Sequence, residues 1–193
     1  MTESPEPKVP RWTEALVNSD YGLIRETPGL EYLFALRDSV LTWRRERIKR
    51  NLATFIEEVE RKLPDPKHRE QVFKDFAHSE DRNTVLDVLP EILEDRDGEL
   101  KSEILARLLL ALLDQRVSLE RFLDLTHILQ RASARTIKFL ATMATAGFDI
   151  EGGIEEYAEE ASLLVAAGVA IRENGALKVN KLGRDLQEIG EIS

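Results

Sequence analysis

Apolar residues recur at helical spacing over most of this chain, and prolines and glycines divide the pattern into segments. The first long segment begins at Thr27, an N-cap hydroxyl followed by proline at the first helical position, and it continues to Leu63. About 35 residues is long for a helix of a globular protein, so a break near residues 44–49 stays open. At about 100° per residue, the core stripe of this segment consists of Leu30, Phe34, Leu41, Ile48, Leu52, Phe55 and Val59.

Further helices are predicted in the middle of the chain, and several carry a capping signal at their start. Asp65 before Pro66 repeats the cap-and-proline signature, and Ser118 and Ser133 can cap two later helices. Pro90 is expected to kink or split the helix that contains it. The predicted helices span residues 66–77, 81–95, 99–115, 119–131 and 134–146.

The segment 99–115 differs from its neighbours because apolar residues occupy most of its circumference. These residues are Ile104, Leu105, Leu108, Leu109, Leu110, Leu112 and Leu113. A helix that is apolar nearly all round is either enclosed by other helices or part of a partner interface. The flanking helices are amphipathic and could surround it, so we expect it to be the central helix of a bundle.

Strand signals occur only near the C-terminus. A helix is expected over residues 154–167. Two short apolar runs, 169–171 and 176–179, flank Asn174-Gly175, which favours the positive φ angles of a type I′ hairpin turn. A last helix is expected from about Lys181.

The pattern predicts an all-α fold: a multi-helix bundle with a C-terminal module that contains one short β-hairpin. We expect an N-terminal tail and short helix over residues 1–26, a helical body over 27–146 and the module over 147–193. The segment Gly147–Gly153 contains three glycines and is the candidate linker.

Composition narrows the classes of function. The chain carries 36 acidic and 27 basic side chains, a formal net charge of −9, and such a surface repels nucleic acid unless its cations are gathered. The absence of cysteine excludes disulfides and thiolate metal sites. The longest apolar run, residues 104–113, is far shorter than the ~20 residues of a membrane-spanning helix. The N-terminus lacks the apolar run of a signal peptide, so we expect a cytoplasmic protein without a membrane anchor.

A basic cluster lies within the first long helical segment. Trp43, Arg47 and Arg50 project to the side opposite the core stripe. Tryptophan and arginine are enriched at interface hot spots, so these residues are a candidate partner-binding surface. Two other interpretations stay open: the arginines hold phosphate, or Trp43 packs under another segment of the chain and the arginines pair with glutamates.

The helix expected over 154–167 contains four glutamates, Glu155, Glu156, Glu159 and Glu160. Because residues four apart share a helix face, like charges stack, which costs a few tenths of a kcal/mol per pair unless a cation answers them. The glutamates can form a solvated acidic face, or meet a basic surface of another chain or of the arginine cluster. Paired carboxylates for acid–base chemistry or a divalent ion are the third interpretation.

Catalytic and cofactor-binding templates do not occur in this sequence. His68, His78 and His127 lie far apart, without a second histidine at metal-ligand spacing. We therefore expect a non-catalytic protein with no cofactor and no metal site.

The run Leu163–Ile171 followed by Leu177–Leu186 resembles the close of a bacterial winged-helix domain, with Asn180 where that family has a capping threonine. The resemblance implies a helix, a β-hairpin wing and a final helix. In the family, the helix before the wing reads the DNA major groove with basic and amide side chains. Here residues 149–193 contain ten acidic and four basic side chains, a net charge of −6. Winged helices without DNA-reading charges serve as protein-docking modules, which the resemblance implies for this chain. The helical body resembles uncharacterised bacterial and prophage proteins.

We therefore expect a protein-interaction or assembly factor that binds a partner with a basic surface and can self-associate. Bacterial defence against phage, or a phage counter-defence, would suit such a factor, although no residue marks that setting. The alternative is a transcription regulator that binds DNA through the arginines of the long helix. A third hypothesis is an unrecognised metal-dependent hydrolase.

Overall fold

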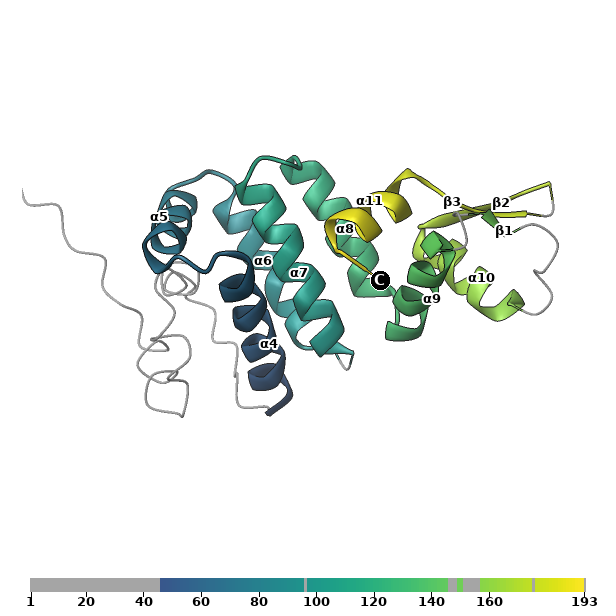
Figure 1. The fold of residues 1–193 in the computed structure, drawn as a ribbon, viewed down its shortest axis with the longest axis horizontal. Helices are drawn as coiled ribbons and strands as arrows, with labels where there is room; N and C mark the ends of the chain where they lie inside the picture. The colour runs from purple at the N-terminus through teal and green to yellow at the C-terminus, as the bar shows by residue number, and fades with distance from the viewer. Residues whose placement is uncertain (1–45, 96, 146–148, 151–156, 175, 193) are drawn as a thin grey trace, which may run out of the picture.

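The computed structural model describes residues 46–95, 97–145, 149–150, 157–174 and 176–192. These residues form an elongated, mainly helical body with a small sheet at one end (Figure 1). The helices are α4 (Glu46–Lys62), α5 (Pro66–Ala77), α6 (Arg82–Leu93), α7 (Gly98–Leu113), α8 (Leu119–Arg131), α9 (Ala134–Thr145), α10 (Ala158–Ala167) and α11 (Lys181–Ile189). The predicted all-α class with one short hairpin is confirmed. The tail and the first part of the long helical segment, up to residue 45, lie outside the described residues.

The predicted helix starts in the middle of the chain are confirmed by their capping hydrogen bonds. The Asp65 carboxylate accepts the Lys67 N–H at 3.0 Å. Ser118 Oγ accepts the Arg121 N–H at 3.2 Å, and Ser133 Oγ accepts the N–H three residues on at 3.1 Å. These caps satisfy N–H groups that have no partner within the helix, which is why they mark helix starts in the sequence.

The expected split at Pro90 does not occur. The proline is buried within α6, and the helix continues beyond it to Leu93. The N–H of Glu94 then donates to the Pro90 carbonyl at 2.9 Å. Packing of α6 against α7 and α8 therefore outweighs the hydrogen bond that proline cannot donate.

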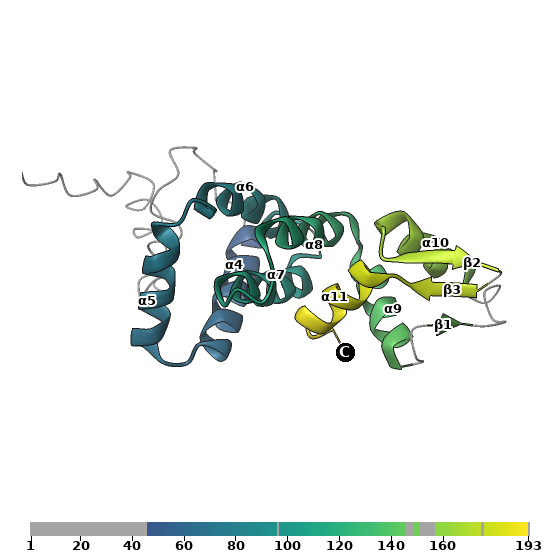
Figure 2. The ribbon, with the colours of Figure 1, turned by 90° about the horizontal axis from the view of Figure 1, so that it is seen from above.

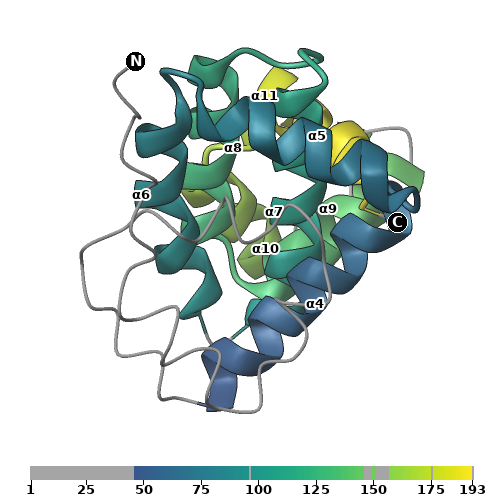
Figure 3. The same cartoon turned by 90° about the vertical axis from the view of Figure 1, so that its left-hand side faces the viewer.

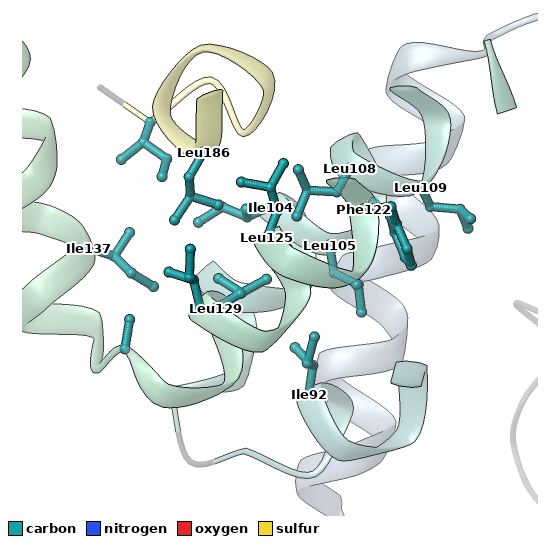
Figure 4. Packing of buried hydrophobic residues seen from close by; sticks show 14 of the residues in the cluster. Ile92, Ile104, Leu105, Leu108, Leu109, Phe122, Leu125, Leu129, Ile137 and Leu186 are labelled. Atoms are coloured by element: carbon teal, nitrogen blue, oxygen red, sulfur yellow. The ribbon is translucent and has the colours of Figure 1, made fainter. Parts of the chain in front are cut away.

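Helix α7 is the central helix, as its sequence predicts. It contacts α4, α6, α8 and α11, and from the α5 end of the molecule α4 and α6 are seen on opposite sides of it (Figure 3). Figure 4 shows Ile104 and Leu108 of α7 beside Leu125 of α8 and Leu186 of α11. Because the buried residues from α4 to α11 form one cluster, the C-terminal module shares the core of the helical body.

The sheet contains three antiparallel strands, β1 (Asp149–Ile150), β2 (Ala170–Glu173) and β3 (Ala176–Val179), in the order β1-β3-β2 (Figure 2). The predicted hairpin is confirmed: Glu173 pairs with Ala176, and Asn174 in the two-residue loop has φ 52°. Strand β1 was not predicted, since its two residues lie in the glycine-rich stretch taken for a linker. The division of the chain at residue 147 stays a prediction, because residues 146–148 and 151–153 lie outside the described part.

The step from the hairpin into α11 has a specific local structure. Asn180 Oδ1 accepts the Gly183 N–H at 2.9 Å, while Asn180 Nδ2 donates to the Gly168 carbonyl at 2.8 Å. A Cβ at Gly183 would lie 2.3 Å from the backbone oxygen of Val169, so only glycine fits this close approach. One asparagine thus joins the end of α10 to the start of α11. None of the described helices is both long and apolar enough to cross a membrane.

Candidate functional site

The two described glutamates of the acidic helix share one cation, which comes from α9. Arg135 Nη1 lies 3.2 Å from Glu159 Oε1, and Arg135 Nη2 donates to Glu160 Oε1. The Glu159 side chain remains 70% exposed, whereas the Glu160 side chain is 19% exposed. The predicted like-charge repulsion is therefore partly answered within the chain, by an arginine outside the predicted basic cluster.

The surroundings of Arg135 and Glu160 favour the charged form of each group. The backbone N–H of Glu160 and the Arg135 side chain both stabilise the Glu160 carboxylate, and they lower its pKa. The hydrogen bond to Glu160, together with both glutamate charges, raises the pKa of Arg135. Because Arg135 and Glu159 are exposed, their contact contributes little to folding, and another cation can take the place of Arg135 at Glu159.

The outward surface of α10 carries no cation in its ten residues. Ala161, Leu164 and Ala167 are buried against the core, and the remaining sides face solvent. We define the α10 face as the exposed residues Glu159, Ser162, Val165 and Ala166. It is acidic near the helix start and uncharged further along.

The Arg172 side chain of strand β2 borders the α10 face. Its Nη2 atom donates to Ser162 Oγ at 2.9 Å and lies 3.4 Å from the Ala158 carbonyl oxygen. The arginine is thus held along the side of α10 by neutral acceptors. Strand β2 and α10 consequently form one continuous surface.

The other predicted site residues are only partly described. Trp43, Glu155 and Glu156 lie outside the described residues. Arg47 belongs to α4, but its side chain is not part of the described structure. Arg50 is exposed, and its Nε lies 3.3 Å from Glu99 Oε1 at the start of α7. Helix α4 and α10 lie in different parts of the molecule, so Arg50 does not answer the acidic helix (Figure 1).

An ionic cluster with a buried pair, Glu58 and Arg107, and an exposed third member, Arg61, escaped the sequence interpretation. Glu58 Oε2 accepts Arg61 Nε at 2.6 Å, and Glu58 Oε1 accepts Arg107 Nε at 2.5 Å. The Glu58 side chain is 6% exposed and the Arg107 side chain 13%. Arg107 Nη1 also donates to the Gly190 carbonyl at 2.6 Å. The Glu58 cluster, defined as Glu58, Arg61 and Arg107, therefore fastens α4, α7 and the end of the chain together.

Burial and ion pairing act in opposite directions on Glu58. Burial raises the pKa of its carboxyl, but the hydrogen bonds and charges of Arg61 and Arg107 outweigh that effect, so the pKa lies below its ordinary value of 4.5. At the solvent edge of the cluster, Lys62 Nζ donates to Glu191 Oε2 at 2.5 Å and lowers the pKa of Glu191. The sequence signal for the cluster was Arg107, the charge that interrupts the apolar run 104–113.

The acids of the turn before α7 also have structural partners. The Asp95 carboxylate binds Lys101 Nζ at 2.8 Å, and the Lys101 side chain is 2% exposed. Asp97 Oδ2 accepts the Ala134 N–H at 2.8 Å, at the start of α9. The Asn51 side chain donates to the Leu93 carbonyl at 2.9 Å. This turn joins α4, α6, α7 and α9.

The described part of the chain contains a groove but no cluster of metal-ligating side chains. A groove of about 670 Å³ runs between the start of α8 and α11, but it carries both signs of charge, as in the 2.8 Å bond from Arg121 Nε to Asp185 Oδ2. Within the described ranges, no three histidine, aspartate or glutamate side chains gather as metal ligands would. His68, His78 and His127 are exposed and separate. The α10 face remains the strongest candidate site.

Comparison with known proteins finds no match. No protein-family model matches the chain, and searches of characterised proteins and of solved structures find no significant similarity.

Proposed function

We propose that this protein is a non-catalytic interaction or assembly factor, and that the α10 face docks onto a protein partner with a basic contact surface. The observation that carries the proposal is the character of the α10 face. Glu159 lies beside the uncharged residues Ser162, Val165 and Ala166, and α10 contains no lysine or arginine. Such a surface complements in charge a protein partner that presents cations.

The order of elements supports a winged-helix-like origin for the module. Helix α10 precedes the β2–β3 hairpin, and α11 follows it. In the family that the sequence resembles, the helix before the hairpin contacts DNA. A helix with Glu159 in that place would meet phosphate repulsion, whereas lysine or arginine of a protein partner would find a counter-charge. The same surface is therefore better suited to a protein than to a polyanion.

The pairing of Arg135 with Glu159 and Glu160 does not obstruct this docking. An exposed pair of this kind contributes little free energy, so its exchange for a cation of the partner is a small cost. The uncharged part of the face then contributes the apolar burial. Charge gives orientation and selectivity, while Val165 gives affinity.

The proposal is tested by affinity capture from the native host with tagged full-length protein. The Glu159→Lys variant is expected to lose a captured protein that the wild type retains. The matched control is Glu120→Lys, which reverses an exposed charge in the first turn of α8 and should keep that protein. Circular dichroism should be unchanged in both variants. An identical set of captured proteins for wild type and Glu159→Lys would contradict the proposal.

A further inference from the structure

Strand β2 lies at an open edge of the sheet. In the order β1-β3-β2, its only strand neighbour is β3. Among the described residues, no further backbone hydrogen bond involves residues 170–173. An open edge of this kind presents unpaired N–H and C=O groups that can receive another strand.

The hairpin register identifies the outward-facing groups. In a hairpin with a two-residue loop, the residues flanking the loop exchange hydrogen bonds, here Glu173 and Ala176. Hydrogen-bonded and non-bonded positions alternate, so Ile171 also bonds β3. The N–H and C=O of Ala170 and Arg172 therefore point away from β3. Ala170 is only 3% exposed, so the groups that are open at this edge are those of the exposed Arg172.

Helix α10 provides a floor beside this edge. It lies against one face of the sheet, on the β2 side (Figures 1 and 2). The hydrogen bond from Arg172 to Ser162 places that part of β2 over the middle of α10. Val165, one turn further along α10, is 39% exposed, and Ile171, on the other face of the strand, is 48% exposed. Two exposed apolar residues thus flank a strand edge with unpaired backbone groups.

We propose that an extended peptide segment of the partner adds to the sheet along β2. Its alternate side chains contact Val165 on one face and Ile171 on the other, and a lysine or arginine at its end meets Glu159. Main-chain hydrogen bonds to Arg172 supply affinity, and the apolar and charged contacts select the sequence. This inference rests on the proposed function, because it states how the α10 face holds its partner.

Antiparallel addition of a second copy to the same edge would bring two α10 helices together, because α10 lies on the β2 side of the sheet. Antiparallel pairing of two β2 strands would place the strands roughly 4.7–4.9 Å apart, as in any sheet. Each strand would bring its own α10 to the same side, yet packed helices need about 8–10 Å between their axes. An extended peptide without a helix beneath it avoids that clash.

The test uses full-length protein and an array of seven-residue peptides with valine at alternate positions and lysine at both ends. Arg172→Pro removes the outward N–H of this residue but no hydrogen bond of the sheet, and proline is tolerated at such edge positions. Arg172→Ala is the matched control, because it removes the same side chain and keeps the N–H. We expect wild type and Arg172→Ala to bind peptides that slow amide hydrogen exchange at residue 172 or its neighbours. Arg172→Pro should bind them at least tenfold more weakly.

The contact between Glu159 and the terminal lysine of the peptide is tested by a separate variant. Glu159→Lys should lose the lysine-ended peptides and gain glutamate-ended ones of the same valine pattern. Equal binding by Arg172→Pro and Arg172→Ala, or no peptide of the array protecting β2, would overturn strand addition. Should the protein captured from the host depend on Glu159 but not on the residue 172 N–H, docking on α10 stands and strand addition is wrong. If it depends on neither, both proposals fail.

Discussion

Two clusters of glutamate and arginine in this protein differ in one property, their exposure to solvent. In the Glu58 cluster, Glu58 is 6% exposed and Arg107 13%. In the pair formed by Arg135 with Glu159, the side chains are 56% and 70% exposed. Similar groups at similar distances therefore serve different purposes. A buried ion pair cannot lose one member without leaving a desolvated charge, whereas an exposed one exchanges its partner at little cost.

The first cluster belongs to the fold, and we propose that the second belongs to a recognition surface. Arg107 connects Glu58 to the Gly190 carbonyl, so the Glu58 cluster holds the C-terminal module against the helical body. Arg135 connects the exposed Glu159 and the less exposed Glu160 at the edge of the α10 face. Substitutions in the two places should separate stability from binding.

The largest expected effect comes from Glu58→Gln. The amide leaves Arg107, which is 13% exposed, without its counter-charge, and we expect the free energy of unfolding to fall by about 3–5 kcal/mol. Urea denaturation measures it. Glu57→Gln, an exposed neighbour on the same helix, is the control and should change stability by less than about 0.5 kcal/mol. Equal losses for the two variants would remove the Glu58 cluster from its structural role.

Acid should weaken the same cluster. The folded-state pKa values of Glu58 and Glu191 lie below their ordinary 4.5, so the stability they contribute is fully present above that value. It is lost as pH falls below about 4.5 and through the lower folded-state values, because the unfolded state then binds more protons. Urea midpoints measured from about pH 7 down to about pH 3 should fall in the wild type. Glu58→Gln should show a shallower fall, and parallel curves would refute this linkage.

A smaller effect is expected at the solvent edge of the Glu58 cluster. Glu191 is 51% exposed and pairs with Lys62, so Glu191→Gln should cost no more than about 1 kcal/mol of unfolding free energy. The same urea experiment compares it with Glu58→Gln. A loss as large as that of Glu58→Gln would mean that burial does not determine how much each ion pair contributes to stability.

The smallest effect on stability is expected for Arg135→Ala. The unfolding midpoint should match that of the wild type, since the pair lies in water. Binding should change instead: with Arg135 gone, Glu159 and Glu160 are free for a cationic partner, and lysine-ended peptides should bind severalfold more tightly. Isothermal titration calorimetry at low salt measures this gain. A clear drop in the unfolding midpoint, with no gain in affinity, would mean that Arg135 and its glutamates stabilise the fold, as Glu58 and Arg107 do.

Local signals made much of the fold predictable. Asp65, Ser118, Ser133 and Asn180 cap helices within three residues of their own positions, and Asn174 turns the hairpin that its dipeptide indicates. These contacts are local, so sequence spacing alone reveals them.

Contacts between distant residues were not predictable in this way. Glu58 and Arg107 are 49 positions apart, and Arg135 and Glu159 are 24 apart. No sequence pattern in either helix of such a pair indicates which other helix it contacts. The two residues of β1 carry no strand signal, because their pairing depends on β3 more than twenty positions later along the chain. The acidic helix of the candidate site was therefore recognisable from the sequence, whereas its pairing with Arg135 could be found only from the fold.

The central claim, that the α10 face binds protein and not a polyanion, is tested most directly by fluorescence anisotropy with a labelled duplex of roughly 30 base pairs at about 50 mM salt. The account predicts no anisotropy change with the wild-type protein at this low salt, where electrostatic attraction to DNA would be strongest. Salt-dependent binding that the Glu159→Lys substitution strengthens, with the amides of α10 protected from hydrogen exchange by the duplex, would contradict it.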